Sequence, residues 1–296
     1  MHITVHYNYI ISICFFQQFF SIILDKTTRF IDNNDAIIYT FNGDKMIEKY
    51  LRYKFKISTF DVLESTNTTA KELAQNGADE GTVIIAKEQT AGKGRLSRTF
   101  FSPNGGLYMS IILRPTISSE KTTFITAAAA VAVCRAIKTV TGIDTGIKWV
   151  NDIYLNGKKV CGILTNGAIN SKNQNLDYAI LGIGLNIDQP KNGFNEEIKN
   201  IATCLFKENC DDKTKAKLTA EILNEFFDLY RNIENKTFLK EYRERSVIIG
   251  KTVFCADSCG EFPVKVEAID DDARLIVTTV CGEKLILNSG EVRIKV

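Results

Sequence analysis

The 296-residue sequence contains only two histidines, His2 and His6, and both lie outside every motif described below. A Ser-His-Asp triad is therefore excluded, and a histidine-based metal site is not expected. The eight cysteines form no Cys-x-x-Cys pair, which favours a reducing cytoplasmic setting over a secreted disulfide scaffold. Cys255, Cys259 and Cys281 could bind zinc as thiolates, but they fall in strand-like runs that favour ordinary buried thiols.

A strong charge imbalance is also absent, because 37 basic and 35 acidic residues give a net charge of +2. This balance argues against a nucleic-acid partner. No membrane span is expected, since the apolar stretch at residues 10–24 contains Gln17 and Gln18 and is shorter than a spanning helix. The stretch does not resemble a signal peptide either, because no basic residue precedes it and no Ala-x-Ala site follows it. We interpret residues 1–45 as an extension of unknown role that contributes little to catalysis.

A basic loop that contains glycine precedes an apolar run in residues 91–115. Gly92 and Gly94 would let the backbone pass close to a ligand. Residues 87–98 hold one anion, Glu88, against four cations, a local balance of 4 − 1 = +3: Lys87, Lys93, Arg95 and Arg98. This concentration predicts a site for a compact oxyanion such as phosphate, although a solvated hairpin turn could contain the same residues. The loop is not a P-loop, because its lysine is not followed by Ser or Thr.

A second polar group surrounds Trp149, the only tryptophan, and consists of Lys148, Asn151 and Asp152. Two short apolar runs follow around Asn156-Gly157, which is a signal for a two-residue hairpin turn. The hairpin would place Lys159 on a rigid strand. Polar groups at a strand end are typical of a functional site, and a salt-bridged surface turn is the alternative.

A third segment, residues 181–188, is a strand-like apolar run that Gly182 and Gly184 interrupt and Asn186 closes. Glycine weakens a strand unless something must come close to it. A ligand that lies across the strand would explain both glycines, and so would a β-bulge.

Together with Ser65-Thr66-Asn67, these segments resemble the biotin protein ligases, which adenylate biotin and pass it to a lysine of a carrier protein. The family pattern runs Ser-Thr-Asn, Gln-x-Ala-Gly-[Arg/Lys]-Gly-Arg, Phe-Ser-Pro, Lys-Trp-Pro-Asn-Asp, Lys-x-x-Gly-Ile-Leu and Gly-x-Gly-x-Asn. It is matched here, in the same order, at residues 65–67, 89–95, 101–103, 148–152, 159–164 and 182–186. The resemblance covers residues 57–190 and continues more loosely to the C-terminus.

The resemblance implies a role for each matched residue. The biotin site would consist of Ser65, Thr66, Asn67, Gln89, Gly92, Arg95, Lys159 and Gly162. The ATP site would consist of Lys93, Arg95, Arg98, Phe100, Lys148, Asn151, Asp152 and Asn186.

The implied catalytic residues are Lys159, Arg95 and Asp152. Attack of a carboxylate on an α-phosphate brings two anions together, so the two cations would stabilise the developing charge. Asp152 would help the acceptor lysine to lose its proton. No protein ligand for a metal is assigned, and Mg²⁺ is expected as the companion of ATP.

Two positions depart from the family pattern. Val150 replaces a proline, from which we expect a looser turn but an intact site. Phe100 replaces a tryptophan that many relatives carry beside the adenine, and a phenyl ring offers a smaller stacking surface.

The resemblance therefore predicts a monofunctional ligase whose partner is a biotin carboxyl carrier protein or domain. One alternative is a biotin-sensing, DNA-binding repressor, but residues 1–56 show no helix-turn-helix pattern. The other is a lipoate protein ligase, which lacks the combination of this glycine loop with the segment at residues 148–152. The identity of the carboxylase and the formation of a homodimer are left open.

The pattern of apolar residues predicts an α+β fold: a mixed sheet with helices packed on one side, and a small SH3-like β-barrel at the C-terminus. Strands are expected at residues 82–88, 107–113, 147–155, 159–165 and 178–187, and helices at 65–77, 120–141, 213–232 and 236–245. The domains would be the extension (1–45), a catalytic domain (46–246) and the barrel (247–296). The barrel would either cover the core or help to dock ATP or the carrier domain.

Overall fold

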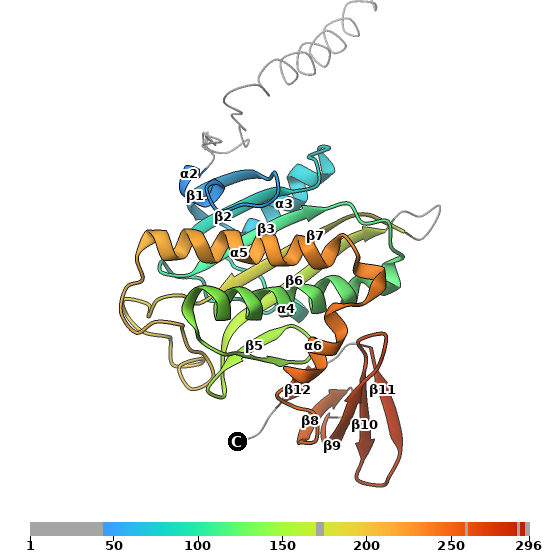
Figure 1. Ribbon diagram of the computed structural model, residues 1–296. Helices are drawn as coiled ribbons and strands as arrows, with labels where there is room; N and C mark the ends of the chain where they lie inside the picture. Colours follow the sequence, from blue (N-terminus) through green and yellow to red (C-terminus); the bar gives the residue numbers. More distant parts are fainter. Residues whose placement is uncertain (1–43, 170–174, 258–259, 289–290, 294–296) are drawn as a thin grey trace, which may run out of the picture.

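The computed structural model describes residues 44–169, 175–257, 260–288 and 291–293 (Figure 1). Residues 1–43, nearly all of the expected N-terminal extension, lie outside the described residues. The expectation that residues 1–56 contain no helix-turn-helix therefore falls mostly outside them too. Cys259, and with it the alternative of a zinc site that includes this thiol, lies outside them too.

A seven-stranded mixed sheet forms the centre of the molecule, with the strand order β1-β2-β3-β7-β6-β5-β4. The β1 and β2 strands are parallel, and every other neighbouring pair is antiparallel. The strands are β1 (Lys56–Leu63), β2 (Thr82–Gln89), β3 (Leu107–Leu113), β4 (Gly146–Lys148), β5 (Asp152–Leu155), β6 (Lys158–Ile169) and β7 (Leu176–Leu185). The expected mixed sheet is confirmed.

The single strand expected at residues 147–155 is wrong, because the chain reverses there into two antiparallel strands, β4 and β5. Tertiary hydrogen bonds hold the reversal in place: Tyr242 Oη donates to Val150 O at 2.8 Å, and Asn151 Nδ2 donates to Ile163 O at 2.8 Å. Trp149 and Val150 are buried, so the turn is not the loose one expected from the loss of proline. These partners come from distant segments, which a local sequence pattern does not reveal.

Two long helices, α4 (Thr122–Thr141) and α5 (Asp212–Tyr230), lie side by side over one face of the sheet (Figure 1). The short helices α2 (Lys45–Glu48) and α6 (Phe238–Glu244) pack against α5 and α4 respectively. The α4 helix ends where expected, at Gly142, whose φ of 75° is the left-handed conformation that favours glycine. Single 3₁₀ turns occupy Ser119–Lys121 and Ile233–Asn235.

The helix α3 (Thr66–Gln75) differs from the others, because it packs on the opposite face of the sheet. Side chains alternate along the strands. Ile84 and Ile112 therefore join Ala70 and Ala74 of α3 in one apolar cluster, while their sequence neighbours join the cluster under α4. The expected placement of helices on one side thus holds for α4, α5 and α6, and α3 is the exception.

Among the described residues, one segment, Ser119–Thr141, is long and apolar enough to cross a membrane. However, 72% of its apolar window is buried inside the protein. The four alanines at residues 127–130 have no exposed surface, which lets α4 approach the sheet and α5 closely. The segment therefore packs as the central core helix.

A second, five-stranded antiparallel sheet follows α6, with the order β11-β10-β9-β8-β12. Its strands are β8 (Thr252–Asp257), β9 (Gly260–Ile269), β10 (Leu275–Thr279), β11 (Lys284–Leu287) and β12 (Glu291–Arg293). This C-terminal sheet is consistent with the expected small barrel. Its buried residues Val253, Val264 and Val277 belong to the same apolar cluster as Trp149, so the two sheets share one continuous core.

Glu241 on α6 accepts hydrogen bonds from Arg135 Nε at 2.8 Å and from Arg245 Nε at 2.7 Å. Burial raises the pKa of this carboxyl, but the two guanidinium groups outweigh that effect and hold the pKa below its ordinary value. A lowered pKa in the folded state means that the ionised carboxylate stabilises the fold.

We therefore expect Glu241→Gln to lower the free energy of unfolding by about 1–2 kcal/mol at pH 7. The stabilisation is complete above the unfolded pKa, about 4.3, and is lost as the pH falls through the lower folded pKa. Urea unfolding of both proteins from pH 7 to pH 3 should show their difference shrinking only below about pH 4.3. A difference that stayed constant down to pH 3 would contradict this assignment.

Candidate functional site

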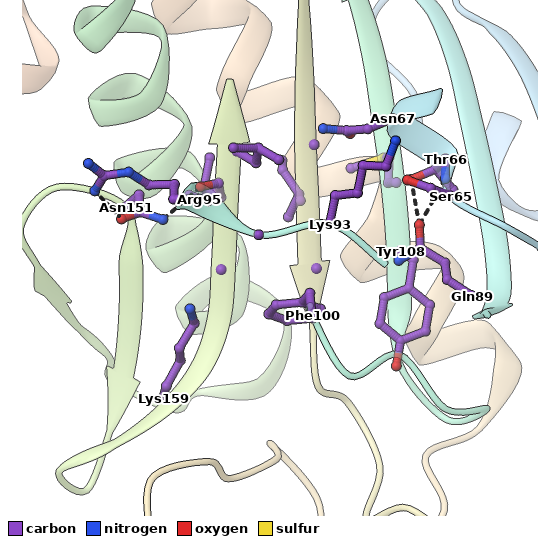
Figure 2. A pocket seen from close by; sticks show the side chains of 18 residues that line it. Ser65, Thr66, Asn67, Gln89, Lys93, Arg95, Phe100, Tyr108, Asn151 and Lys159 are labelled. Atoms are coloured by element: carbon purple, nitrogen blue, oxygen red, sulfur yellow. Dashed lines mark hydrogen bonds between the residues drawn. The ribbon is translucent and has the colours of Figure 1, made fainter. Parts of the chain in front are cut away.

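Two pockets adjoin on the face of the sheet that carries α3. The first lies over β3, β6 and β7 beside the N-terminus of α3, and the second opens toward residues 186–202 and the C-terminal sheet. Five residues line both pockets, which makes them the junction: Gly94, Arg95, Phe100, Asn151 and Lys159. The fold thus brings together residues from all the segments that the sequence singled out, and Figure 2 labels those from residues 65–67, 89–108 and 151–159.

Glycines form part of the floor of the first pocket. Gly162 on β6 pairs with Gly184 on β7, and the ring of Phe100 lies over both. An added Cβ would lie 2.6 Å from the ring at Gly184 and 2.9 Å from it at Gly162. At Gly182 it would collide with the side-chain oxygen of Asn67. The register of β7 is regular at these positions, so close approach explains the glycines and a bulge does not.

A chain of hydrogen bonds forms one wall of the first pocket. The Oε1 atom of Gln89 accepts from Thr66 N at 2.8 Å and from Thr66 Oγ1 at 3.1 Å (Figure 2). Gln89 Nε2 donates to Ser102 Oγ at 2.9 Å. Ser110 Oγ lies 2.8 Å from Thr66 Oγ1 and 2.5 Å from Asn67 Oδ1. The chain orients the amide of Gln89 and the first turn of α3 toward the pocket.

Ser65 stands at the N-cap position of α3, as the sequence predicted, but its hydroxyl makes no capping hydrogen bond. Its Oγ atom is buried, lines the first pocket and has no hydrogen-bond partner within the described part of the chain. A buried hydroxyl without a partner is costly unless a ligand engages it. Ser65 is therefore a strong candidate for a direct contact with a ligand.

The glycine loop is a hairpin, in which Lys93 pairs with Thr99 in an antiparallel bridge and residues 96–99 at the tip are exposed. Gly94 N donates to Arg98 O at 2.7 Å, and a 3₁₀ turn (Arg95–Ser97) follows, in which Leu96 has a φ of 54°. Arg95 Nη1 donates to Asn151 Oδ1 at 3.0 Å, which ties the loop to the turn between β4 and β5 (Figure 2). Arg95 is thereby held at the junction of the two pockets.

Lys159 on β6 and Asp152 on β5 form an ion pair, with Nζ 2.7 Å from Oδ1. The two side chains are 30% and 19% exposed, so this is not a solvated surface turn. The contact is electrostatic, because Oδ1 does not meet the angles of a hydrogen bond. The ammonium also lies 5.6 Å from the centre of the Phe100 ring. A carboxylate and an aromatic face hold this cation at the junction.

Other predicted residues fall on one side of the junction. Lys93 lines the first pocket and not the second, whereas Arg98, Lys148 and Asn186 line the second. Asn186 is buried and donates through Nδ2 to Thr203 O at 2.9 Å. Gly92 lines neither pocket, and an added Cβ there would collide with Phe100 O and Ser102 Oγ. Its role is to permit close packing of the loop.

Sequence reasoning missed several residues of the site. Tyr108 on β3 lines the first pocket, and burial raises the pKa of its hydroxyl, which donates to Pro103 O at 2.7 Å. Ser110, two positions further along β3, is fully buried and supports the pocket wall through Thr66 and Asn67. A polar residue inside an otherwise apolar strand was the available signal for Ser110. Glu261 reaches the second pocket from the C-terminal sheet, and nothing in the local sequence indicates this.

Comparisons with known proteins agree with this geometry. Residues 59–186 match the model of the biotin/lipoate A/B protein ligase family. The chain is 39% identical over 256 residues to the bifunctional ligase/repressor BirA of Bacillus subtilis, covering 83% of this chain and 78% of the relative. It is 29% identical over 245 residues to the biotin–[acetyl-CoA-carboxylase] ligase of Mycobacterium tuberculosis, covering 78% and 87% respectively.

Among solved structures, the biotin protein ligase from Aquifex aeolicus in complex with biotin and ATP superposes with a TM-score of 0.64 and 26% identity, covering 81% of this chain and 98% of that one. The chain therefore belongs to the biotin/lipoate A/B protein ligase family. It is a ligase enzyme, and the resemblance to the biotin protein ligases noted from the sequence motifs is confirmed.

Proposed function

We propose that this ligase converts biotin and ATP into biotinyl-5'-AMP and then transfers biotin to a lysine of a biotin carboxyl carrier protein. The observation that carries the proposal is the shared lining of the two pockets, because a reaction between two bound molecules needs a common boundary. Arg95 and Lys159, two cations, lie at that boundary. The related Aquifex aeolicus enzyme was solved with both biotin and ATP.

The first pocket suits biotin. Its hydrogen-bonding wall, with Ser65, Thr66 and Gln89, could serve the ureido ring, and the glycines let Phe100 and Asn67 pack close to the sheet at the border of the pocket. The carboxylate of biotin would then point toward the junction. Asn67 would order the wall through its contact with Ser110, and Gly162 would let the ligand and Phe100 approach the sheet.

The second pocket suits ATP, since it combines cations with apolar side chains. Arg98 and Lys148 would face the phosphates, and Asn186 would face the ribose or the base. Phe100 would stack on the adenine. Mg²⁺ would enter with the nucleotide and be held mainly by phosphate oxygens, since no group of three His, Cys, Asp or Glu side chains that could hold a metal occurs in the described part of the chain.

In the first step, an oxygen of the biotin carboxylate attacks the α-phosphorus, and the bond to pyrophosphate breaks. Arg95 and Lys159 would offset the repulsion between the two anions and stabilise the charge on the transferred phosphorus centre. In the second step, the acceptor amine attacks the acyl carbon and AMP leaves. Asp152 would take up the proton of the acceptor amine, once the ammonium of Lys159 is shared between Asp152 and the adenylate.

Several related assignments remain part of the proposal. We place the enzyme in the cytoplasm, because six cysteines of the described residues are free thiols: Cys134, Cys161, Cys204, Cys210, Cys255 and Cys281. We also propose that it acts as a ligase without repressor activity, on the basis of its near-zero net charge. Its Bacillus subtilis relative is named a bifunctional ligase/repressor, so operator binding is the property to test.

The test is ATP-dependent transfer of labelled biotin to a purified biotin carboxyl carrier domain, with lipoate offered in a parallel reaction. We expect transfer of biotin and not of lipoate. Binding of biotin without transfer would redirect the assignment to a biotin-binding regulator, and transfer of lipoate would redirect it to the lipoate ligases. A mobility-shift assay with the promoter DNA of biotin-synthesis genes would test the absence of repressor activity.

Gly182 offers a way to separate the two pockets, because it lines the first and not the second. An added methyl group there would collide with Asn67. We expect Gly182→Ala to raise the KM for biotin about tenfold, a cost close to 1.4 kcal/mol, and to leave the KM for ATP unchanged. Steady-state kinetics with each substrate varied in turn would check this, and an equal rise in both KM values would argue against the assignment of the pockets.

A further inference from the structure

The indole of Trp149 connects the active-site turn to the C-terminal sheet. Its Nε1 atom donates to Ala273 O at 2.9 Å, across 124 positions of sequence. Trp149 is 4% exposed and Ala273 is fully buried, so water does not compete for this hydrogen bond. Trp149 lines the second pocket and lies two residues before Asn151, which contacts Arg95, and three before Asp152, which contacts Lys159.

The acceptor carbonyl is presented by a turn that joins β9 to β10 and that Asp270 organises. Asp270 Oδ1 accepts from Asp272 N and from Arg274 N, each at 2.9 Å, and Oδ2 accepts from Arg274 Nε at 2.7 Å. Ala273 has a φ of 60°, a conformation that is uncommon for a residue with a Cβ. The carboxylate of Asp270 therefore stabilises a backbone shape that would otherwise be unfavourable.

Helix α6 and the residue Lys236 before it contact both the turn at residues 270–274 and the turn at residues 149–151. Arg243 Nε donates to Ile269 O at 2.7 Å, and Lys236, just before α6, donates through Nζ to Asp271 O at 2.7 Å. From the same helix, Tyr242 Oη donates to Val150 O at 2.8 Å. The turn at residues 270–274 is thus held to α6 and Lys236 by partly buried and exposed hydrogen bonds, and the turn at residues 149–151 is held to α6 by a buried one.

We infer that the turn at residues 270–274 positions the catalytic turn, with Trp149 and Asp270 as positioning residues that touch no reacting atom. Through this contact the C-terminal sheet sets the placement of Asn151 and Asp152 beside Arg95 and Lys159. This goes beyond a covering or docking role for the second domain, and it rests on the proposed function of the site. It predicts a loss in the rate of adenylation rather than in the binding of biotin, because Trp149 does not line the first pocket.

The test compares Trp149→Phe, which removes the N–H donor and keeps an aromatic ring, with Asp270→Ala, which removes the support of the turn. We expect each to lower kcat for biotin-dependent pyrophosphate exchange about two- to tenfold, the range of one hydrogen bond, with the KM for biotin unchanged. Because both changes break the same contact, the double variant should lose no more activity than the less active of the two single variants. Glu283→Ala, in the turn at the other end of β10, is the control and should behave as the wild type.

Trp149 also gives a readout that does not depend on activity, since it is the only tryptophan of the chain. We expect Asp270→Ala to shift its emission to longer wavelength as the indole becomes hydrated. Asp270→Asn retains an acceptor oxygen for the two amide groups, so it should keep most of the wild-type emission and activity. This second variant keeps the test valid if Asp270→Ala does not fold.

The inference would be overturned if the fold-losses in kcat of the two single variants multiplied in the double variant. It would also be overturned if Asp270→Ala left both kcat and the tryptophan emission unchanged. A rise in the KM for biotin that accounted for the whole loss in activity would overturn it as well. A wild-type protein that failed to exchange pyrophosphate with biotin would instead contradict the proposed function, and the two failures are therefore distinguishable.

Discussion

Replacing Lys159 by alanine is expected to reduce biotin-dependent pyrophosphate exchange by about 10²–10³-fold, the cost of removing one preorganised charge from a reacting centre. Lys159 lines both pockets, and its ammonium is held by Asp152 at 2.7 Å and by the ring of Phe100. It is therefore placed before the substrates arrive and requires little reorganisation. The loss should fall mainly on kcat, because in the proposed reaction Lys159 stabilises a charge that develops only in the transition state.

Lys158→Ala is the matched control. Lys158 is the neighbouring residue of the same strand, and its ammonium donates to Lys199 O at 3.2 Å at an exposed position. It lines neither pocket at the junction. If both lysine variants lost activity to the same extent, a general effect on β6 would explain the result better than a catalytic role for Lys159.

Arg95→Ala is expected to have the second large effect, a loss of about 10²-fold in kcat/KM for biotin. The substitution removes a cation from the junction and leaves Asn151 Oδ1 without its donor. Arg95→Lys should recover part of the activity only, because an ammonium supplies the charge but not the planar pair of donors. Equilibrium binding of biotin and of ATP should be measured separately. Because Arg95 lines both pockets, we expect Arg95→Ala to weaken the binding of both ligands.

Arg231→Ala is a suitable control for the removal of an arginine, since Arg231 lies over the ring of Tyr53 at the end of α5 and lines neither pocket. An Arg95→Ala protein that bound and activated biotin normally would refute the placement of this side chain at the reaction centre.

Much of the site could be identified from the sequence because its residues are packed into short motifs. Lys93, Arg95 and Arg98 are concentrated in one glycine-containing loop, and two glycines interrupt the strand at residues 181–188. Such patterns depart from the ordinary composition of strands and loops, so they indicate positions where function or close packing dictates the residue type. The central strands and the two long helices were predictable for a different reason, since their apolar runs and end signals lie within single elements.

Other features depend on contacts between distant segments. The reversal at residues 149–151 is stabilised by Tyr242 and by Ile163 O, which no local pattern connects to it. The position of α3 on the opposite face follows from the alternation of β2 and β3, which matters only once the strands are paired. Ser110 likewise becomes a site residue through its contact with Thr66, 44 positions earlier.

The amino-acid sequence by itself determined the chemistry of this protein: which cations, amides and glycines are available, and the motifs through which its family is recognised. The tertiary structure alone decided how they meet. It placed Arg95 and Lys159 at a boundary shared by two pockets, put Lys93 on one side of it, and joined the turn at residues 149–151 to the C-terminal sheet through Trp149. The physical reason is that residue type follows from local demands, whereas the distance between residues far apart in the chain is set by the packing of the whole core.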